Sequence, residues 1–187
     1  MVKKISSSVF ISGDGSNLKS ILKNSRDYNF PIKIGLIISN NIKAHGLKYA
    51  REYNIPFKFY SSDNQDFFER NCLAELRKKR IKFLCLAGFM KKLSKKFIKN
   101  FGYKIINIHP SLLPKFKGLN TQKRVLESKE KYTGCTVHYV TPELDSGKII
   151  LQKKILIKKS DTENSLKKRV LTQEHKLYPK AIRLVFK

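Results

Sequence analysis

Short runs of apolar, largely β-branched residues alternate along the chain with segments whose apolar positions recur at the helical period. Seven of the apolar runs are predicted strands: Ser8–Ile11, Ile32–Ser39, Phe57–Tyr60, Phe83–Ala87, Ile105–Ile108, Thr136–Val140 and Ile149–Ile157. The predicted helices lie between them: Asn17–Asn24, Ala44–Tyr53, Gln65–Lys79, Ser94–Lys99 and Thr121–Ser128. Several strands are apolar throughout, which is typical of strands covered on both faces. The pattern predicts an α/β fold in one domain, residues 1–187, with a mostly parallel twisted sheet of about seven strands and helices on both faces.

The end of the chain departs from this alternation. Only the segment 141–148 separates the last two predicted strands, so this pair is expected to be antiparallel or irregular. Ser160-Asp-Thr-Glu163 has the signature of a capping box and predicts the start of a C-terminal helix. A break is expected at Pro179, after which Ala181 and Leu184 continue an apolar stripe.

Charge is the most unusual feature of the composition. The 40 Lys and Arg residues against 14 Asp and Glu give a formal net charge of +26. Such a balance raises a nucleic-acid partner as one hypothesis. However, 32 of the cations are Lys and only 8 are Arg, and they are spread along the chain. Because arginine is the residue that reads guanine and clamps phosphates, this usage favours a solvated, compositionally biased surface over a specific nucleic-acid site.

Several classes of protein are disfavoured by what the sequence lacks. No apolar run approaches the roughly 18 residues of a membrane span, and the N-terminus does not resemble a secretory signal. The three cysteines, Cys72, Cys85 and Cys135, are widely spaced and indicate small core residues in a reducing compartment. The four histidines show no metal-ligand spacing. We therefore expect a cytoplasmic protein without a membrane partner or a metal site.

The first predicted strand leads into a helix through Ile11-Ser-Gly-Asp-Gly-Ser-Asn-Leu18. Two glycines let the backbone approach an anion, and the helix N-terminus directs free N–H groups at it. A dinucleotide site would need a third glycine at Leu18 and an acidic residue after the second strand, where Asn40 and Asn41 stand. The loop is therefore interpreted either as a site for a small phosphorylated substrate or as a turn that merely begins a helix.

The central segment carries the most specific chemistry. Asn107 and His109 lie two residues apart on a predicted strand, so their side chains share a face at its end. An amide donor beside an imidazole can stabilise a developing oxyanion and move a proton. Asp145, in the turn Glu143-Leu-Asp-Ser-Gly147, is the candidate to orient His109 and raise its pKa. On another interpretation, Asp145 belongs to an ordinary surface turn.

Taken together, the motifs resemble those of the phosphoribosylglycinamide formyltransferases, folate-dependent enzymes of de novo purine synthesis with a Rossmann-like formyltransferase fold. The matching segments include the loop described above, Leu86-Ala-Gly-Phe-Met90, Ile106-Asn-Ile-His-Pro-Ser-Leu-Leu-Pro-Lys115, Glu143-Leu-Asp-Ser-Gly147 and Thr172-Gln-Glu-His175. The resemblance runs from the first strand to the end of the chain. It implies transfer of a formyl group from the co-substrate 10-formyltetrahydrofolate to the amino group of glycinamide ribonucleotide.

The resemblance also implies roles for individual residues. Asn107, His109 and Asp145 match the catalytic residues, with protonated His109 stabilising the oxyanion and Asp145 keeping it charged. The residues implied to bind the nucleotide substrate are Gly15, Ser16 and Asn17 for its phosphate and Glu174 for its ribose. Those implied to line the folate pocket are Met90, Lys91, Lys92, Leu93, Phe97, Ile105 and Val140.

Some positions differ from the family pattern, and other functions stay open. Asp14 lies beside the phosphate loop, Gln65 stands where some members place a folate-contacting arginine, and Lys117 alters a loop often written Pro-Gly-Leu-His. A methionyl-tRNA formyltransferase-like catalytic domain is one alternative function, and it would use the basic charge. A basic nucleic-acid-binding protein without enzymatic activity is another.

Overall fold

A computed structural model describes residues 4–187. Its seven strands form one sheet in the order β3-β2-β1-β4-β5-β6-β7. The contacts divide the chain into two compact units, the first ending at Ile106 and the second beginning at Asn107. Within residues 4–187, the structure contains no helix long and apolar enough to cross a membrane.

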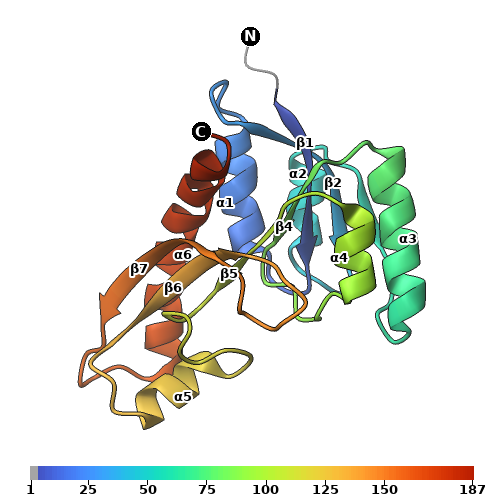
Figure 1. Ribbon diagram of the computed structural model, residues 1–187. Coiled ribbons are helices and arrows are strands. Elements are labelled where there is room, and N and C mark those ends of the chain that lie inside the picture. Colours follow the sequence, from blue (N-terminus) through green and yellow to red (C-terminus); the bar gives the residue numbers. More distant parts are fainter. Residues whose placement is uncertain (1–3) are drawn as a thin grey trace. The chain divides into compact units, whose positions relative to one another are not determined.

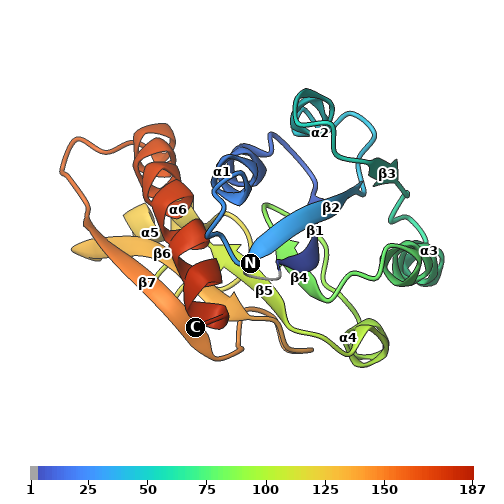
Figure 2. The same ribbon diagram turned by 90° about the horizontal axis from the view of Figure 1, so that it is seen from above.

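The first unit alternates strands and helices. Its elements are β1 (Ile5–Ile11), α1 (Ser16–Ser25), β2 (Ile32–Ser39), α2 (Leu47–Glu52), β3 (Phe57–Phe59), α3 (Gln65–Lys78), β4 (Phe83–Leu86) and α4 (Lys95–Phe101), with the first residues of β5 (Ile105–His109) at its end. β1 pairs in parallel with β2 and with β4, and β2 pairs in parallel with β3. Figure 2 shows α1 and α2 on one face of these strands and α3 and α4 on the other. The predicted parallel, doubly covered arrangement is therefore confirmed for this unit.

An aromatic cluster fills the face of the first unit that α3 and α4 cover. Phe10 of β1 contacts the rings of Phe68, Phe89 and Phe97, with centroid distances between 5.5 and 6.2 Å. Phe68 and Phe89 also stack on each other. All four side chains are buried. The cluster fixes both helices, and the segment that carries Phe89, against the strands.

The second unit is built on an antiparallel pair. Its elements are α5 (Thr121–Glu127), β6 (Tyr132–Tyr139), β7 (Ile149–Leu156) and α6 (Glu163–Val185). β6 and β7 run antiparallel, as the short connection between them predicts, with a register shift at Val137/His138. α6 packs along both strands (Figure 1). Its buried residues include Leu166, Val170 and Tyr178.

Two expectations about the C-terminal helix are wrong. Its capping box uses Thr162 and Ser165 in place of Ser160 and Glu163. Pro179 lies inside α6, which continues without a break to Val185. Proline removes one backbone donor, but Tyr178, Ala181 and Ile182 around it are fully buried. Their packing holds the helix through the proline.

The predicted strand boundaries also need correction. β1 begins at Ile5, three residues before the predicted start, and β6 begins at Tyr132, four residues early. The additional residues include Ser6, Ser7, Thr133 and Gly134. Small polar residues and glycine gave no apolar pattern there, although Ser7 and Thr133 are buried in the strands.

Candidate active site

Asn107, His109 and Asp145 lie in one hydrogen-bonded network of the second unit. Asn107 and His109 point to the same side of β5, as their spacing predicts. The Nδ1 atom of His109 lies 3.3 Å from Oδ2 of Asp145. Both side chains are 7% exposed, so solvent does little to screen this pair. The structure thus brings together the three residues that the sequence selected from separate segments.

Backbone groups of the segment 116–118 complete this network. The Nε2–H of His109 donates to the carbonyl of Phe116 at 2.8 Å. The backbone N–H of Gly118 donates to Oδ2 of Asp145 at 2.9 Å. Because a carbonyl oxygen can only accept, Nε2 of His109 carries a hydrogen in both the neutral and the charged form of the ring.

His138 is a further member of the network, although the sequence analysis did not select it as a site residue. Its Nδ1–H donates to the carbonyl of Tyr139 at 2.9 Å, so in the neutral ring Nε2 is an acceptor. That atom lies 3.3 Å from Nδ2 of Asn107 and 3.6 Å from Oδ1 of Asp145. An unprotonated Nε2 of His138 can accept one N–H of the Asn107 amide, which leaves the other N–H available as a donor. The only signal in the sequence was its position on a strand near the Asp145 turn.

The turn that carries Asp145 is tightly closed. Asp145 has a φ of 47°, in the left-handed region that aspartate tolerates better than most residues. A Cβ atom at Gly147 would lie 1.8 Å from the carbonyl oxygen of Tyr139, so only glycine fits there. Lys117 donates to the hydroxyl of Ser146 and links the turn to the segment 116–118. The carboxylate is thereby held against His109.

Burial and neighbouring polar groups shift the pKa values of His109 and Asp145 in opposite directions. Burial lowers the pKa of His109 below 6.5, and the smaller raising effects of the Phe116 carbonyl and Asp145 do not compensate. Asp145 thus raises the pKa as expected, but the ligand-free protein favours neutral His109 instead of the charged form expected from the sequence. For Asp145, burial raises the pKa, whereas the nearby imidazole of His138, the N–H of Gly118 and the His109 ring lower it, and the net value is below 3.8.

This balance yields a prediction for the ligand-free protein. We expect the His109 ring to titrate below pH 6.5 in nitrogen-15 NMR spectra. In Asp145→Asn, its pKa should fall further, because the carboxylate that favours the charged ring is lost. A His109 titration above 6.5, or a rise of its pKa in Asp145→Asn, would contradict this assignment of causes.

The predicted phosphate loop is in the first unit. Gly15 is the N-cap of α1 with a φ of 69°, and no side chain caps this end of the helix. The first turn of α1 contains no acidic residue, Ser16 begins the helix and Asn17 is buried. Asp14 is paired with His45, at 3.2 Å, and both side chains are largely exposed. The backbone N–H groups at this end thus suit an anion.

Gly15 has a second structural requirement. A Cβ atom here would lie 2.5 Å from Cα of Gly46, whose N–H donates to the carbonyl of Gly13. We expect Gly15→Ala to cost at least about 1–2 kcal/mol for the left-handed backbone alone, with a further cost for displacing Gly46. Thermal denaturation measures the loss. Gly13→Ala is the matched control, because its Cβ would meet nothing within 4 Å and its melting temperature should stay near wild type. Equal melting temperatures for the two variants would disprove the argument.

The remaining predicted binding residues differ in exposure. Glu174 is buried on α6. Burial raises the pKa of the Cys135 thiol to about 12, and the nearby charge of Glu174 adds to this rise. Met90, Lys91 and Lys92 are exposed in the segment after β4. Leu93, Phe97 and Ile105 are core residues, at 3%, 0% and 3% exposure, and Val140 is half-buried after β6.

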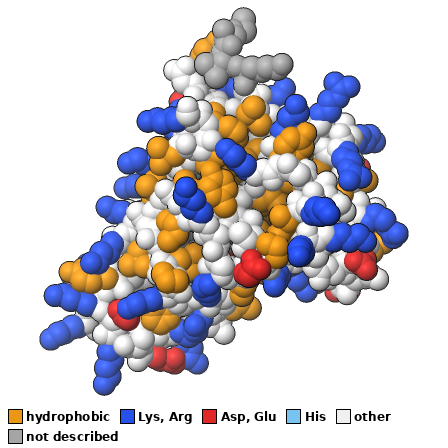
Figure 3. Space-filling model, in the orientation of Figure 1, with side chains coloured by type: hydrophobic (Ala, Val, Ile, Leu, Met, Phe, Trp, Pro, Cys, Tyr) orange, Lys and Arg blue, Asp and Glu red, His pale blue; other side chains and the backbone are white. Residues whose placement is uncertain are grey.

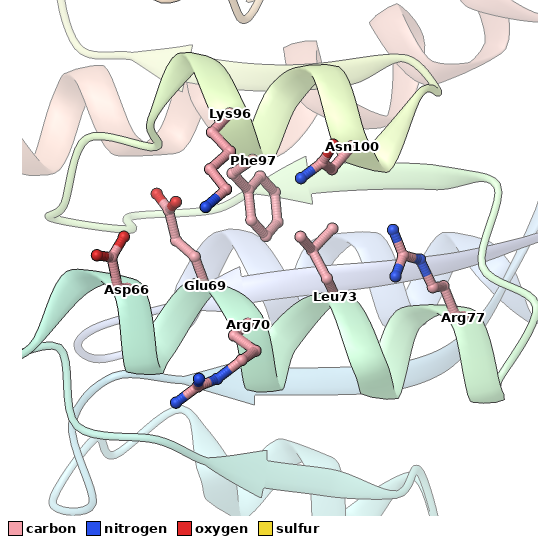
Figure 4. A pocket seen from close by; sticks show the side chains of 8 residues that line it. All are labelled: Asp66, Glu69, Arg70, Leu73, Arg77, Lys96, Phe97 and Asn100. Atoms are coloured by element: carbon pink, nitrogen blue, oxygen red, sulfur yellow. The ribbon is translucent and has the colours of Figure 1, made fainter.

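One groove of about 370 Å³ lies between α3 and α4 (Figure 4). Its lining residues are Asp66, Glu69, Arg70, Leu73, Arg77, Lys96, Phe97 and Asn100. Of the residues predicted to bind folate, only Phe97 contributes to it. Among residues 4–187, no three His, Cys, Asp or Glu side chains are grouped as a metal site requires.

Comparison with known proteins gives consistent matches. A family model described as formyl transferase matches residues 5–182. The chain is 39% identical to the phosphoribosylglycinamide formyltransferase of Haemophilus influenzae, covering 97% of this chain and 86% of that protein. It is 40% identical to the human trifunctional purine biosynthetic protein adenosine-3 over 98% of its length, but it spans only 18% of that larger protein.

Solved structures agree with the sequence matches. The crystal structure of phosphoribosylglycinamide formyltransferase from Anaplasma phagocytophilum superposes with a TM-score of 0.92 at 42% identity, covering 98% of this chain and 87% of that one. The enzyme from Brucella melitensis gives 0.92 at 37% identity, covering 98% and 96%. The predicted α/β class with its seven-stranded, mostly parallel sheet is therefore confirmed.

Proposed function

The chain belongs to the formyl transferase family, and we propose that it transfers the formyl group of 10-formyltetrahydrofolate to the amino group of glycinamide ribonucleotide. The observation that carries the proposal is the hydrogen-bonded network of Asn107, His109 and Asp145, which supplies donors for an oxyanion. We further propose that residues 1–187 act as one formyltransferase domain. Three buried free cysteines fit the reducing cytoplasm, which we propose as its location.

The proposed reaction is a direct transfer. The amine nitrogen attacks the formyl carbon, a carbon–nitrogen bond forms, and the carbonyl oxygen becomes an oxyanion. The bond from that carbon to the folate nitrogen then breaks, and a proton moves from the attacking amine to the departing folate nitrogen. The products are tetrahydrofolate and the N-formylated nucleotide.

Each residue of the network has a part in this step. The free N–H of Asn107 and the Nε2–H of His109 stabilise the oxyanion, and His109 turns from the Phe116 carbonyl to do so. Neutral His109 already carries this hydrogen, and negative charge arriving with the reaction raises the imidazole pKa. Asp145 supports the charge that develops on the ring.

Binding of the two substrates is assigned by the family resemblance. Gly15, Ser16 and Asn17 bind the phosphate, and the uncapped N-terminus of α1 supports this assignment. Glu174 binds the ribose hydroxyls. Met90, Lys91, Lys92, Leu93, Phe97, Ile105 and Val140 are assigned to the folate.

In the proposed function, the excess positive charge acts as a general field on the substrates and does not require a nucleic-acid partner. Lys and Arg side chains are scattered over the face shown in Figure 3 and are not gathered in one stripe. Both proposed substrates are anionic, so the positive field steers them toward the protein. We do not assign a specific nucleic-acid partner.

A choice among acceptors tests the function. With 10-formyltetrahydrofolate as donor, we expect rapid formation of tetrahydrofolate when glycinamide ribonucleotide is present, and only background rates with initiator methionyl-tRNA or with water. Preferred formylation of the tRNA would replace the proposal with the tRNA-dependent alternative. Salt-sensitive RNA binding without turnover of any acceptor would favour the non-enzymatic one.

A further inference from the structure

The segment Gly88–Ser94, which connects β4 to α4, is held at both ends by polar contacts. At its start, the backbone N–H of Ser12 donates to the carbonyl of Gly88 at 3.1 Å. The hydroxyl of Ser12 accepts the N–H of Met90 at 2.8 Å. The exposed residues Met90, Lys91 and Lys92 lie between these contacts and the far end of the segment.

A buried carboxylate holds the far end. Glu69 of α3 is 5% exposed and points toward α4 (Figure 4). Its Oε1 atom accepts the backbone N–H of Ser94 at 2.7 Å and the side-chain amide of Gln65 at 3.0 Å. Its Oε2 atom accepts the hydroxyl of Ser94. The Gln65 amide also donates to the carbonyl of Lys92 at 3.2 Å.

The donors around Glu69 require a carboxylate. The Ser94 hydroxyl caps α4 by accepting the N–H of Phe97 at 3.0 Å, so its single hydrogen is given to Glu69. Glu69 therefore meets donors on both oxygens. A glutamine of the same size would turn an NH2 group toward one of them and lose at least one hydrogen bond.

We propose that Glu69, with Gln65 as its partner, is the positioning residue that fixes Met90–Leu93 for binding of the formyl-folate. This inference rests on the proposed function. Gln65 stands where some family members place an arginine that contacts the folate. Here its side-chain amide donates to the backbone carbonyl of Lys92 instead. In this chain, Gln65 therefore acts on the folate indirectly, through the segment Met90–Leu93.

Glu69 and Gln65 should affect the binding of only one of the two substrates. Glu69 and Gln65 contact the segment assigned to the folate, and none of their described hydrogen bonds reaches the phosphate loop 13–17. Loss of the carboxylate should therefore weaken folate binding selectively. The network of Asn107 and His109 stays intact, so the chemical step should continue at its normal rate once both substrates are bound.

Steady-state kinetics with both substrates provide the test. For Glu69→Gln, we expect the KM for 10-formyltetrahydrofolate to rise on the order of 10-fold, with kcat changed less than about 2-fold and the KM for glycinamide ribonucleotide unchanged. Gln65→Ala, at an exposed position that leaves the buried carboxylate in place, should raise the same KM about 3-fold. Glu75→Gln is the matched control, because Glu75 lies on the same helix and faces Lys58 instead.

The outcomes distinguish the inference from the function on which it rests. An unchanged folate KM in folded Glu69→Gln, or an equal rise for both substrates, overturns the positioning role while the function stands. If Glu69→Gln does not fold, an unchanged folate KM in Gln65→Ala overturns it. Absence of formyl transfer by the wild-type protein overturns the proposed function and this inference together.

Discussion

Replacing His109 by alanine is expected to lower kcat for formyl transfer by about 10²–10³-fold, the usual effect of removing one donor to an oxyanion. The imidazole supplies the Nε2–H that the carbonyl of Phe116 accepts in the ligand-free protein. Because the donor acts on charge that develops during the reaction, the KM values should change much less than kcat. Steady-state rates of tetrahydrofolate formation measure the effect.

A second variant separates the lost donor from lost packing. Glutamine can bring an amide N–H close to the position of Nε2, so His109→Gln should recover part of the rate that His109→Ala loses. The melting temperatures of both variants establish that they fold. A folded His109→Ala protein with wild-type kcat would remove His109 from the mechanism.

Asp145→Asn is expected to lower kcat by roughly 10²-fold, although the side chain keeps its shape. Asp145 accepts the N–H of Gly118 and faces His109 and His138. An amide would turn an N–H group toward one of these partners and would no longer stabilise positive charge on His109. The same kinetic assay measures the loss.

Asp161→Asn is the control for this variant. Asp161 also has a pKa below 3.8: burial raises it, but the backbone N–H of Lys158 and the hydroxyl of Ser165 lower it, with a further contribution from Arg169. Its replacement should reduce the melting temperature without changing kcat, because it supports the start of α6 and lies outside the proposed network. Equal loss of kcat in both variants would show that the effect of Asp145 is general destabilisation.

The sequence predicted the sheet well because its strands are apolar runs separated by helical patterns. It failed where other forces dominate. Ser6 and Ser7 in β1 carried no apolar signal, although the strand includes them. Pro179 favours a break by its local chemistry, but the burial of Tyr178 and Ile182 maintains the helix. Both errors arise from tertiary packing, which a local pattern does not contain.

For the candidate site too, the sequence predicted some features and not others. The spacing of Asn107 and His109 on one strand predicts a shared face, and the carboxylate of the Asp145 turn, the predicted partner of His109, lies beside it. The contributions of Phe116 and Gly118 come from backbone groups, so their side chains gave no indication of them. His138 and Glu69 were missed because a single buried polar residue looks the same in a sequence whether or not it contacts functional groups.

The most direct test of the account follows the transferred group itself. Wild-type protein is incubated with 10-formyltetrahydrofolate labelled with carbon-13 in the formyl group and with unlabelled glycinamide ribonucleotide, and the products are identified by NMR and mass spectrometry. We expect the label to appear on the amino nitrogen of the nucleotide, one equivalent for each tetrahydrofolate formed. Release of the label as free formate, or recovery of unmodified nucleotide after the incubation, would contradict direct transfer to the nucleotide.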